Sequence, residues 1–206
     1  MKHILLSLVC CLLSVALNAQ GLSEQKIIEK MASAAATIKT VQCNFTQTKH
    51  MKLLKEEMVS KGKMSCQQPD KLRWEYTYPV SNTLILNGTK AKTFSNSPDG
   101  EKSTPLKGGV AGSMARMIMN SVAGKYLSDS KTFQVSAKEM PTEYVATLLP
   151  LRNDMKRMFT KLVLHFDLNQ STVTQVEMYE KSGDRTVIEL HDISINKPIN
   201  AETFVN

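Results

Sequence analysis

Period-two alternation of apolar and polar residues is the feature that most limits the folds open to this chain. In runs such as 58–66 and 71–78, apolar side chains keep one parity and polar side chains the other, which is typical of strands with one buried face. Turn-forming pairs, among them Asn87-Gly88 and Ser182-Gly183, separate the runs. The predicted strands are 41–46, 58–66, 71–78, 83–86, 91–94, 131–137, 143–149, 158–167, 172–180 and 185–195. So many antiparallel strands in succession predict one strongly curved sheet.

The first predicted hairpin contains both cysteines that follow residue 20. A register that pairs Cys43 with Cys66 also pairs Phe45 with Met64 on the same face. Two facing cysteines would form either a disulfide, which an exported protein can keep, or two buried free thiols. Both readings stay open, because geometry decides between them.

The last predicted hairpin, 172–195, allows a firmer choice of register. A three-residue loop, 181–183, with Gly183 in the left-handed conformation pairs Val176 with Ile188. This register puts apolar side chains beside apolar ones on one face, so it is the one expected.

Residues 1–19, MKHILLSLVCCLLSVALNA, have the layout of a secretory signal peptide. Lys2 precedes an apolar core that is too short for a confident membrane span, and a cut after Ala19 is expected. An N-terminal membrane anchor is the alternative. The remaining residues, 20–206, suit one domain, and the mature protein is expected to be exported.

The net charge of +7 falls to +6 once Lys2 is removed with the signal peptide. The basic residues are dispersed, with no run that resembles a nucleic-acid-binding arm. A mildly basic exported protein suits anionic membrane surfaces or acidic partners, and the competing interpretation is that the charge serves solubility alone.

Two segments show helical rather than period-two spacing. Residues 23–39 have one apolar face, and residues 108–124 carry an apolar stripe that includes Met114, Met117 and Ile118. Glycines flank the second segment. It is either a core helix between flexible loops or a lid whose methionines repack around a ligand of variable shape.

The run 71–78 carries a broad aromatic surface on one face. Leu72, Trp74, Tyr76 and Tyr78 share one parity, and Trp74 is the only tryptophan of the chain. These side chains either pack directly against the helices or line a cavity.

Residue patterns for catalysis or metal binding are weak. Ser128 and Lys131 have the Ser-x-x-Lys spacing of some acyl-enzyme hydrolases, without the companion motifs. His50, His165 and His191 lie far apart and lack metal-ligand spacing. The sequence predicts no catalytic residues, no metal site and no cofactor.

The motifs CNFTQTK (43–49), SKGKMSCQQPDKLRWEYTYPVSNTLILNG (60–88) and DISINKPINAETF (192–204) follow one another in a familiar order. In them the chain resembles the periplasmic outer-membrane lipoprotein carrier proteins, the LolA family, and in particular those of Bacteroidetes-type bacteria. The resemblance implies an α+β fold, a single strongly curved antiparallel sheet forming an unclosed half-barrel with helices covering its concave face.

The resemblance also implies a lipid-binding cavity and a lid. The residues expected to line that cavity are Phe45, Met64, Leu72, Trp74, Tyr76, Leu84, Leu86, Met114, Met117 and Ile118. Family members often have a basic residue before the proline of the second motif, where it holds the lid shut. Gln68 occupies that position here, so an uncharged lid latch is expected.

The function implied is a monomeric periplasmic chaperone that carries acylated lipoproteins from the inner to the outer membrane. Its partners would be those lipoproteins, an inner-membrane lipoprotein-releasing transporter and an outer-membrane receptor. Alternatives are a carrier for another lipid or hydrophobic precursor, an outer-membrane receptor of the same fold, and a module that senses mislocalised lipoproteins. A receptor would need a lipidated cysteine at its mature N-terminus, which the sequence lacks.

Overall fold

A computed structural model describes residues 22–205 except 54, 98–99, 106–109 and 170, and it gives no side-chain description for 96–114. The predicted signal peptide therefore lies outside the described residues. Within the described part, no helix is both long enough and apolar enough to cross a membrane.

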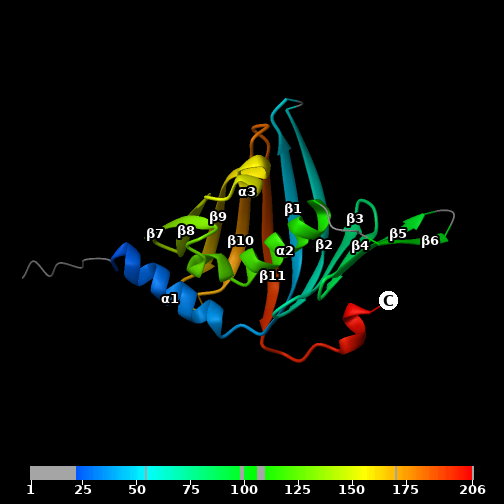
Figure 1. The fold of residues 1–206 in the computed structure, drawn as a ribbon, viewed down its shortest axis with the longest axis horizontal. Coiled ribbons are helices and arrows are strands. Elements are labelled where there is room, and N and C mark those ends of the chain that lie inside the picture. The colour runs from blue at the N-terminus through cyan, green and yellow to red at the C-terminus, as the bar shows by residue number, and fades with distance from the viewer. Residues whose placement is uncertain (1–21, 54, 98–99, 106–109, 170, 206) are drawn as a thin grey trace, which may run out of the picture.

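Eleven antiparallel strands form one sheet in the order β6-β5-β4-β3-β2-β1-β11-β10-β9-β8-β7. β6 and β7 are its two edges, so the curved sheet stays unclosed, and the predicted half-barrel is confirmed (Figure 1). Among the described strands, only β1 and β11 are sheet neighbours that do not follow one another along the chain. The strands are β1 (Thr40–Met51), β2 (Glu56–Gln67), β3 (Lys71–Tyr78), β4 (Asn82–Asn87), β5 (Lys90–Ser97), β6 (Gly100–Pro105), β7 (Phe133–Glu139), β8 (Glu143–Pro150), β9 (Phe159–Asp167), β10 (Val173–Glu180) and β11 (Arg185–Ile195).

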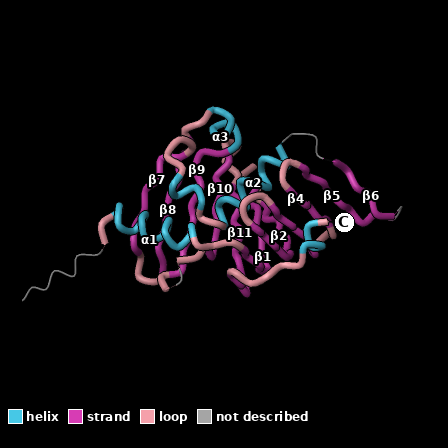
Figure 2. Tube along the Cα trace, turned by 60° about the horizontal axis from the view of Figure 1, so that its bottom comes forward, coloured by secondary structure: helices cyan, strands magenta, loops and turns pink. Residues whose placement is uncertain are grey.

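The helices cover the concave face of this sheet. They are α1 (Glu24–Ala36), α2 (Val110–Val122) and α3 (Asn153–Met158), with two 3-10 turns, η1 (Lys125–Ser128) and η2 (Ala201–Phe204). α1 lies across the β7–β8 end of the sheet and α2 across its middle, where it contacts β10, β3 and β4 (Figures 1 and 2). Both predicted helices are confirmed, whereas the sequence analysis missed β6 and α3. Their sequences, GEKSTP and NDMKRM, are short and carry little apolar periodicity.

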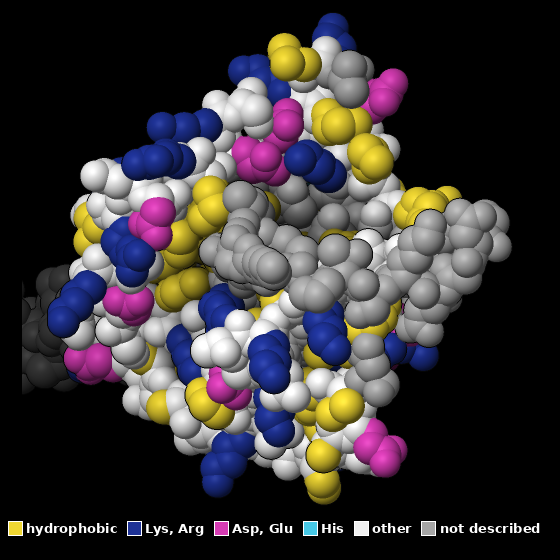
Figure 3. Space-filling model, turned by 45° about the vertical axis from the view of Figure 1, so that its right-hand side comes forward, with side chains coloured by type: hydrophobic (Ala, Val, Ile, Leu, Met, Phe, Trp, Pro, Cys, Tyr) yellow, Lys and Arg dark blue, Asp and Glu magenta, His cyan; other side chains and the backbone are white. Residues whose placement is uncertain are grey.

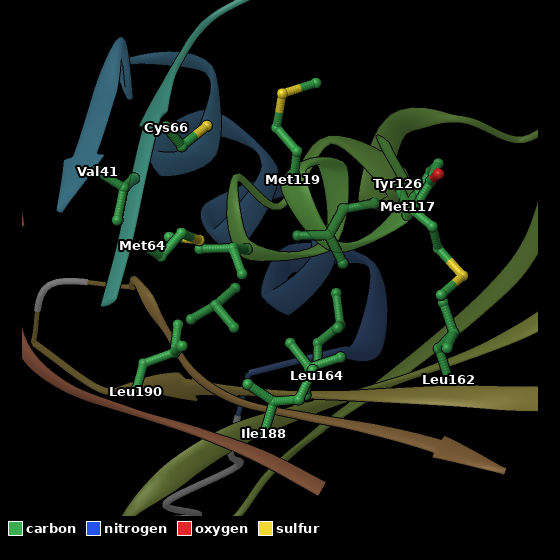
Figure 4. Packing of buried hydrophobic residues seen from close by; sticks show 14 of the residues in the cluster. Val41, Met64, Cys66, Met117, Met119, Tyr126, Leu162, Leu164, Ile188 and Leu190 are labelled. Atoms are coloured by element: carbon green, nitrogen blue, oxygen red, sulfur yellow. The ribbon is translucent and has the colours of Figure 1, made fainter. Parts of the chain in front are cut away.

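The buried core continues from α2 to the strands beneath it. Figure 4 shows Met117 of α2 reaching toward Leu162 of β9, while Leu164 and Ile188 lie between the helices and the sheet. Met117, Leu162 and Leu164 are all buried. This side of α2 is therefore fixed by packing against the second half of the sheet.

The register predicted for the β10–β11 hairpin is confirmed. Val176 pairs with Ile188, and Gly183 adopts the left-handed conformation with φ +89°. The loop therefore has the three residues expected from the pairing of apolar side chains.

The β1–β2 register differs by two residues from the one that would place Cys43 opposite Cys66. Cys43 pairs with Met64 rather than Cys66, and Phe45 pairs with Gly62. A two-residue slip leaves every side chain on its predicted face. The observed register is favoured because the Phe45 ring lies over Gly62, where an added Cβ would stand 2.5 Å from Phe45 Cζ.

Candidate functional site

An apolar cavity of about 170 Å³ lies between α2 and the β3–β5 part of the sheet. The sheet residues of its lining share one face, because alternate residues of β3 and β4 point to the concave side of the sheet. In the observed register, Trp74 pairs with Leu84, and Leu84 in turn with Thr93. The lining consists of Leu72, Trp74, Tyr76, Asn82, Leu84, Thr93, Ala115 and Ile118.

Three aromatic rings form one wall of this cavity and its support. The Trp74 ring stacks on Phe45 at 3.9 Å between centroids, and Tyr76 meets Phe45 edge-on at 5.5 Å. The Tyr76 hydroxyl donates to Gln47 Oε1 at 3.1 Å, and burial raises the pKa of Tyr76. Trp74 Nε1 is buried and has no hydrogen-bond acceptor among the described residues. The wall is thus an aromatic surface with one unused donor.

Among the described side chains, Arg116 ties the helix side of the cavity to the sheet. Arg116 of α2 donates from its guanidinium to the carbonyl of Gly88, at the turn between β4 and β5, over 3.1 Å. Ala115 and Ile118, on either side of Arg116 and Met117 in the sequence, face the cavity. α2 therefore closes over the cavity with packing on one side and a charge-assisted hydrogen bond on the other.

Five of the ten residues predicted to line a cavity do so. They are Leu72, Trp74, Tyr76, Leu84 and Ile118. Four others do not line this cavity: Phe45 stacks on Trp74, and Met64, Leu86 and Met117 are packed in the core. The side chain of Met114 lies outside the described ones.

The two predictions for polar and sulfur side chains near the site have separate outcomes. Gln68 is buried at both polar side-chain atoms, and neither has a hydrogen-bond partner among the described residues. Its role as a latch stays a prediction. Cys43 and Cys66 are free, buried thiols, and burial raises the pKa of each to about 12.

Asn82, Thr93, Ala115 and Arg116 were not predicted from the sequence. The first three are small or polar, and they border the cavity because they do not fill it. The sequence pattern does not indicate a structural role for Arg116, because it lies on the polar side of an amphipathic helix and such a residue usually faces solvent. Only its contact with the Gly88 carbonyl shows a structural role.

Residues that bear catalytic or metal-binding chemistry do not gather in this cavity. Within the described chain, no three His, Cys, Asp or Glu side chains are arranged to hold a metal ion. His165 lies between Glu143 and Glu177, at 3.0 and 3.1 Å from their carboxylates. It follows Leu164, which is buried in the core, so its side chain lies on the opposite face of the sheet.

Comparison with known proteins agrees with this geometry. Residues 36–206 match the family model described as outer membrane lipoprotein carrier protein LolA. The chain belongs to the LolA family. A relative named outer-membrane lipoprotein carrier protein from Legionella pneumophila (strain Corby) is 25% identical over 181 residues, 87% of this chain and 85% of that protein. A protein of the same name from Chromohalobacter salexigens is 24% identical over 145 residues, 70% of this chain and 65% of that protein.

Solved structures show the same fold at low sequence identity. A DUF1329 family protein from Desulfovibrio piger has a TM-score of 0.51 at 9% identity, covering 87% of this chain and 94% of that one. MucB has a TM-score of 0.51 at 10% identity, covering 89% of this chain and 62% of its own. The LolA-family fold is therefore shared by proteins with very different sequences.

Proposed function

We propose that this protein is a periplasmic chaperone that shields the acyl chains of lipoproteins and carries them from the inner to the outer membrane. The observation that carries the proposal is the apolar cavity between α2 and β3–β5, in a chain of the LolA family. The signal-peptide pattern of residues 1–19 supports export. The proposed partners are acylated lipoproteins, an inner-membrane transporter that releases them and an outer-membrane receptor.

The size of the cavity supports a moving helix. A volume of about 170 Å³ is below the roughly 300–1,000 Å³ of common ligand pockets, so it holds only part of one acyl chain. Uptake of a lipoprotein would require α2 to move away from β3–β5. The tie between Arg116 and Gly88 is the contact that such a movement would break.

The energetics explain why a closed empty state is useful to a carrier. Burying an acyl chain contributes about 0.8 kcal/mol per methylene, so the chains of one lipoprotein supply well over ~10 kcal/mol when all are shielded. A carrier with no opposing cost would not release them. Closure of α2 over the empty cavity, with the Arg116 hydrogen bond restored, supplies that opposing free energy.

Release of a lipoprotein from membranes tests the function directly. Purified protein is incubated with inner-membrane vesicles that contain the transporter and an acylated lipoprotein, and the soluble fraction is analysed by intact mass spectrometry. We expect a one-to-one complex of protein and acylated lipoprotein. The matched control is the same lipoprotein with its acylated cysteine replaced by serine, which should not be bound. Equal binding of both forms, or of neither, would exclude an acyl-chain carrier.

A crosslink tests the movement of α2. Ile118 and Leu84 line the cavity from opposite sides, so Ile118→Cys with Leu84→Cys and a short thiol crosslinker should lock the cavity. The native thiols are buried and have raised pKa values, so they should not compete. The locked protein should fold but not take up lipoprotein, and the same double variant without the crosslinker should take it up. Uptake by the locked protein would make α2 a static core helix.

A further inference from the structure

The described residues include one group of exposed apolar side chains at the end of β1–β2 and at the β3–β4 turn. The group, called here the apolar rim, consists of Leu53, Met58, Val59, Tyr78 and Val80. Leu53 at the hairpin tip is 88% exposed and Val80 is 67% exposed. Figure 1 shows the β1–β2 hairpin projecting beyond the rest of the sheet, and Figure 3 shows hydrophobic side chains there beside Lys and Arg.

Strand pairing brings part of the apolar rim together. Lys61 of β2 pairs with Tyr78 of β3, which brings Val59, two residues before Lys61, next to the β3–β4 turn that carries Val80. Exposed single apolar residues are common on proteins. Clustering at one projecting end, by contrast, marks an interaction site.

The hairpin tip is held in place by the neighbouring β10–β11 turn. The Lys52 backbone N–H donates to Asp184 Oδ1 at 3.1 Å. The stem of Lys52 also lies against Gly183, where an added Cβ would stand 2.7 Å from Lys52 Cδ. Leu53 therefore projects from a supported tip, which lowers the entropy lost when it is buried against a partner.

The cavity and the apolar rim adjoin each other. Tyr76 and Asn82 line the cavity and pair with each other at the end of β3–β4. Tyr78 and Val80 lie between those two residues in the chain. The β3–β4 turn thus joins the cavity lining to the apolar rim along the chain, and a bulge after Tyr76 turns Tyr78 to the opposite face of the sheet, where it pairs with Lys61.

The charges around the apolar rim suit an anionic surface. Lys52 and Lys55 flank the hairpin tip and form no ion pair with any described residue. The acidic residues around the tip are Glu56, Glu57, which lies 2.9 Å from His50, and Asp184 of the adjoining β10–β11 turn, where Lys181 adds a third basic residue. Two free lysines beside exposed apolar side chains are the pattern of a segment that lies in a lipid headgroup region.

We infer that the apolar rim docks this protein directly on the surface of a bilayer containing anionic lipids. Leu53 and Val80 enter the boundary between headgroups and acyl chains, and Lys52 and Lys55 contact lipid phosphates. The inference goes beyond carriage, because it gives the protein a membrane contact of its own. Only the biological purpose of docking rests on the proposed function, because docking itself is measurable with no lipoprotein present.

Vesicle flotation with the cargo-free protein tests the inference. The vesicles are phosphatidylcholine alone and an equal mixture with phosphatidylglycerol. We expect binding to the mixture, weakened by salt, and about tenfold weaker binding for Leu53→Ser and for Val80→Ser, because each loses one buried apolar side chain. The matched control is Val205→Ser. Val205 is 58% exposed near the C-terminus, beside Phe204, whose carbonyl contacts Asn87 at the opposite end of β4. This variant should bind as the unmodified protein does.

A dye at the tip gives a second, independent readout. Leu53→Cys labelled with an environment-sensitive fluorophore should shift to the blue when mixed vesicles are added, and Val205→Cys should not. Absence of vesicle binding by the unmodified protein would overturn the inference, as would equal weakening by Val80→Ser and Val205→Ser. A dimer that Leu53→Ser dissociates, without vesicle binding, would assign the apolar rim to a second copy of the chain instead. None of these outcomes alters the lipoprotein-release result, so failure here and failure of the proposed carrier are distinguishable.

Discussion

Ala115→Leu fills part of the cavity and should weaken lipid binding while leaving the fold at least as stable. Ala115 is buried on α2 and borders the cavity of about 170 Å³. The substitution adds three carbon atoms to that space. An acyl chain then loses shielding of about three methylene groups, or roughly 2.4 kcal/mol at ~0.8 kcal/mol each, which corresponds to about fiftyfold weaker binding.

The assay is titration with a triacylated lipopeptide, followed by the fluorescence of Trp74, which lines the cavity and stacks on Phe45. Urea unfolding measures stability in parallel. Ala146→Leu is the control, because Ala146 is fully buried in the core and away from the cavity lining. Overpacking there should cost about 1–3 kcal/mol of stability and leave the affinity of the folded protein unchanged.

The two variants should therefore change the two measurements in opposite ways. If Ala115→Leu binds lipopeptide as tightly as the unmodified protein, the ligand does not occupy this cavity. If it destabilises the fold as much as Ala146→Leu does, the space beside Ala115 is not available for a ligand at all.

Three further results are expected. Arg116→Met removes the hydrogen bond to the Gly88 carbonyl and should speed lipopeptide entry by up to about tenfold in stopped-flow fluorescence; an unchanged rate would show that the contact does not hold α2 closed. The pKa values of Cys43 and Cys66 are raised from 9.0 to about 12, so the thiolate fraction of each is about a thousandth of that of an ordinary cysteine. Both should therefore react with a thiol reagent only after unfolding. Rapid labelling of the native protein would contradict their burial. Gly62→Ala forces a Cβ into the ring and backbone of the neighbouring strands and should lower the free energy of unfolding by about 3 kcal/mol in urea; a change below about 0.5 kcal/mol would refute the observed register.

Alternation in the sequence was enough to predict every described strand except β6 and, away from the bulges, the face on which a side chain lies. Leu72, Trp74 and Tyr76 point to the concave face as their shared parity predicts. The β1–β2 register could not be predicted in this way, because a slip of two residues preserves parity. What selects the register is the fit of the Phe45 ring over Gly62, a contact between strands that no single strand encodes.

The same limit explains the partial prediction of the cavity. Parity tells which side chains face inward, but not which of them a neighbour covers. Leu86 and Met117 face the core and are fully packed, while Leu84 and Ile118 face the same side and border open space. A cavity exists where side chains are too small to meet. A pattern of large apolar side chains therefore does not predict that a residue such as Thr93 lines the cavity.

The pairing of β1 with β11 has a consequence for how the chain folds. It joins His50 to Arg185 and Val41 to Ile195, positions that lie at opposite ends of the domain sequence. β1 to β6 can pair in succession as hairpins, but β1 keeps a bare edge until β11 has been made and has found it. Contacts so distant along the chain close slowly, and a bare strand edge recruits other strands in the meantime. A chain that ends before residue 185 would keep most of the strands around the cavity and expose β1 as a permanent edge, and it should therefore aggregate rather than fold.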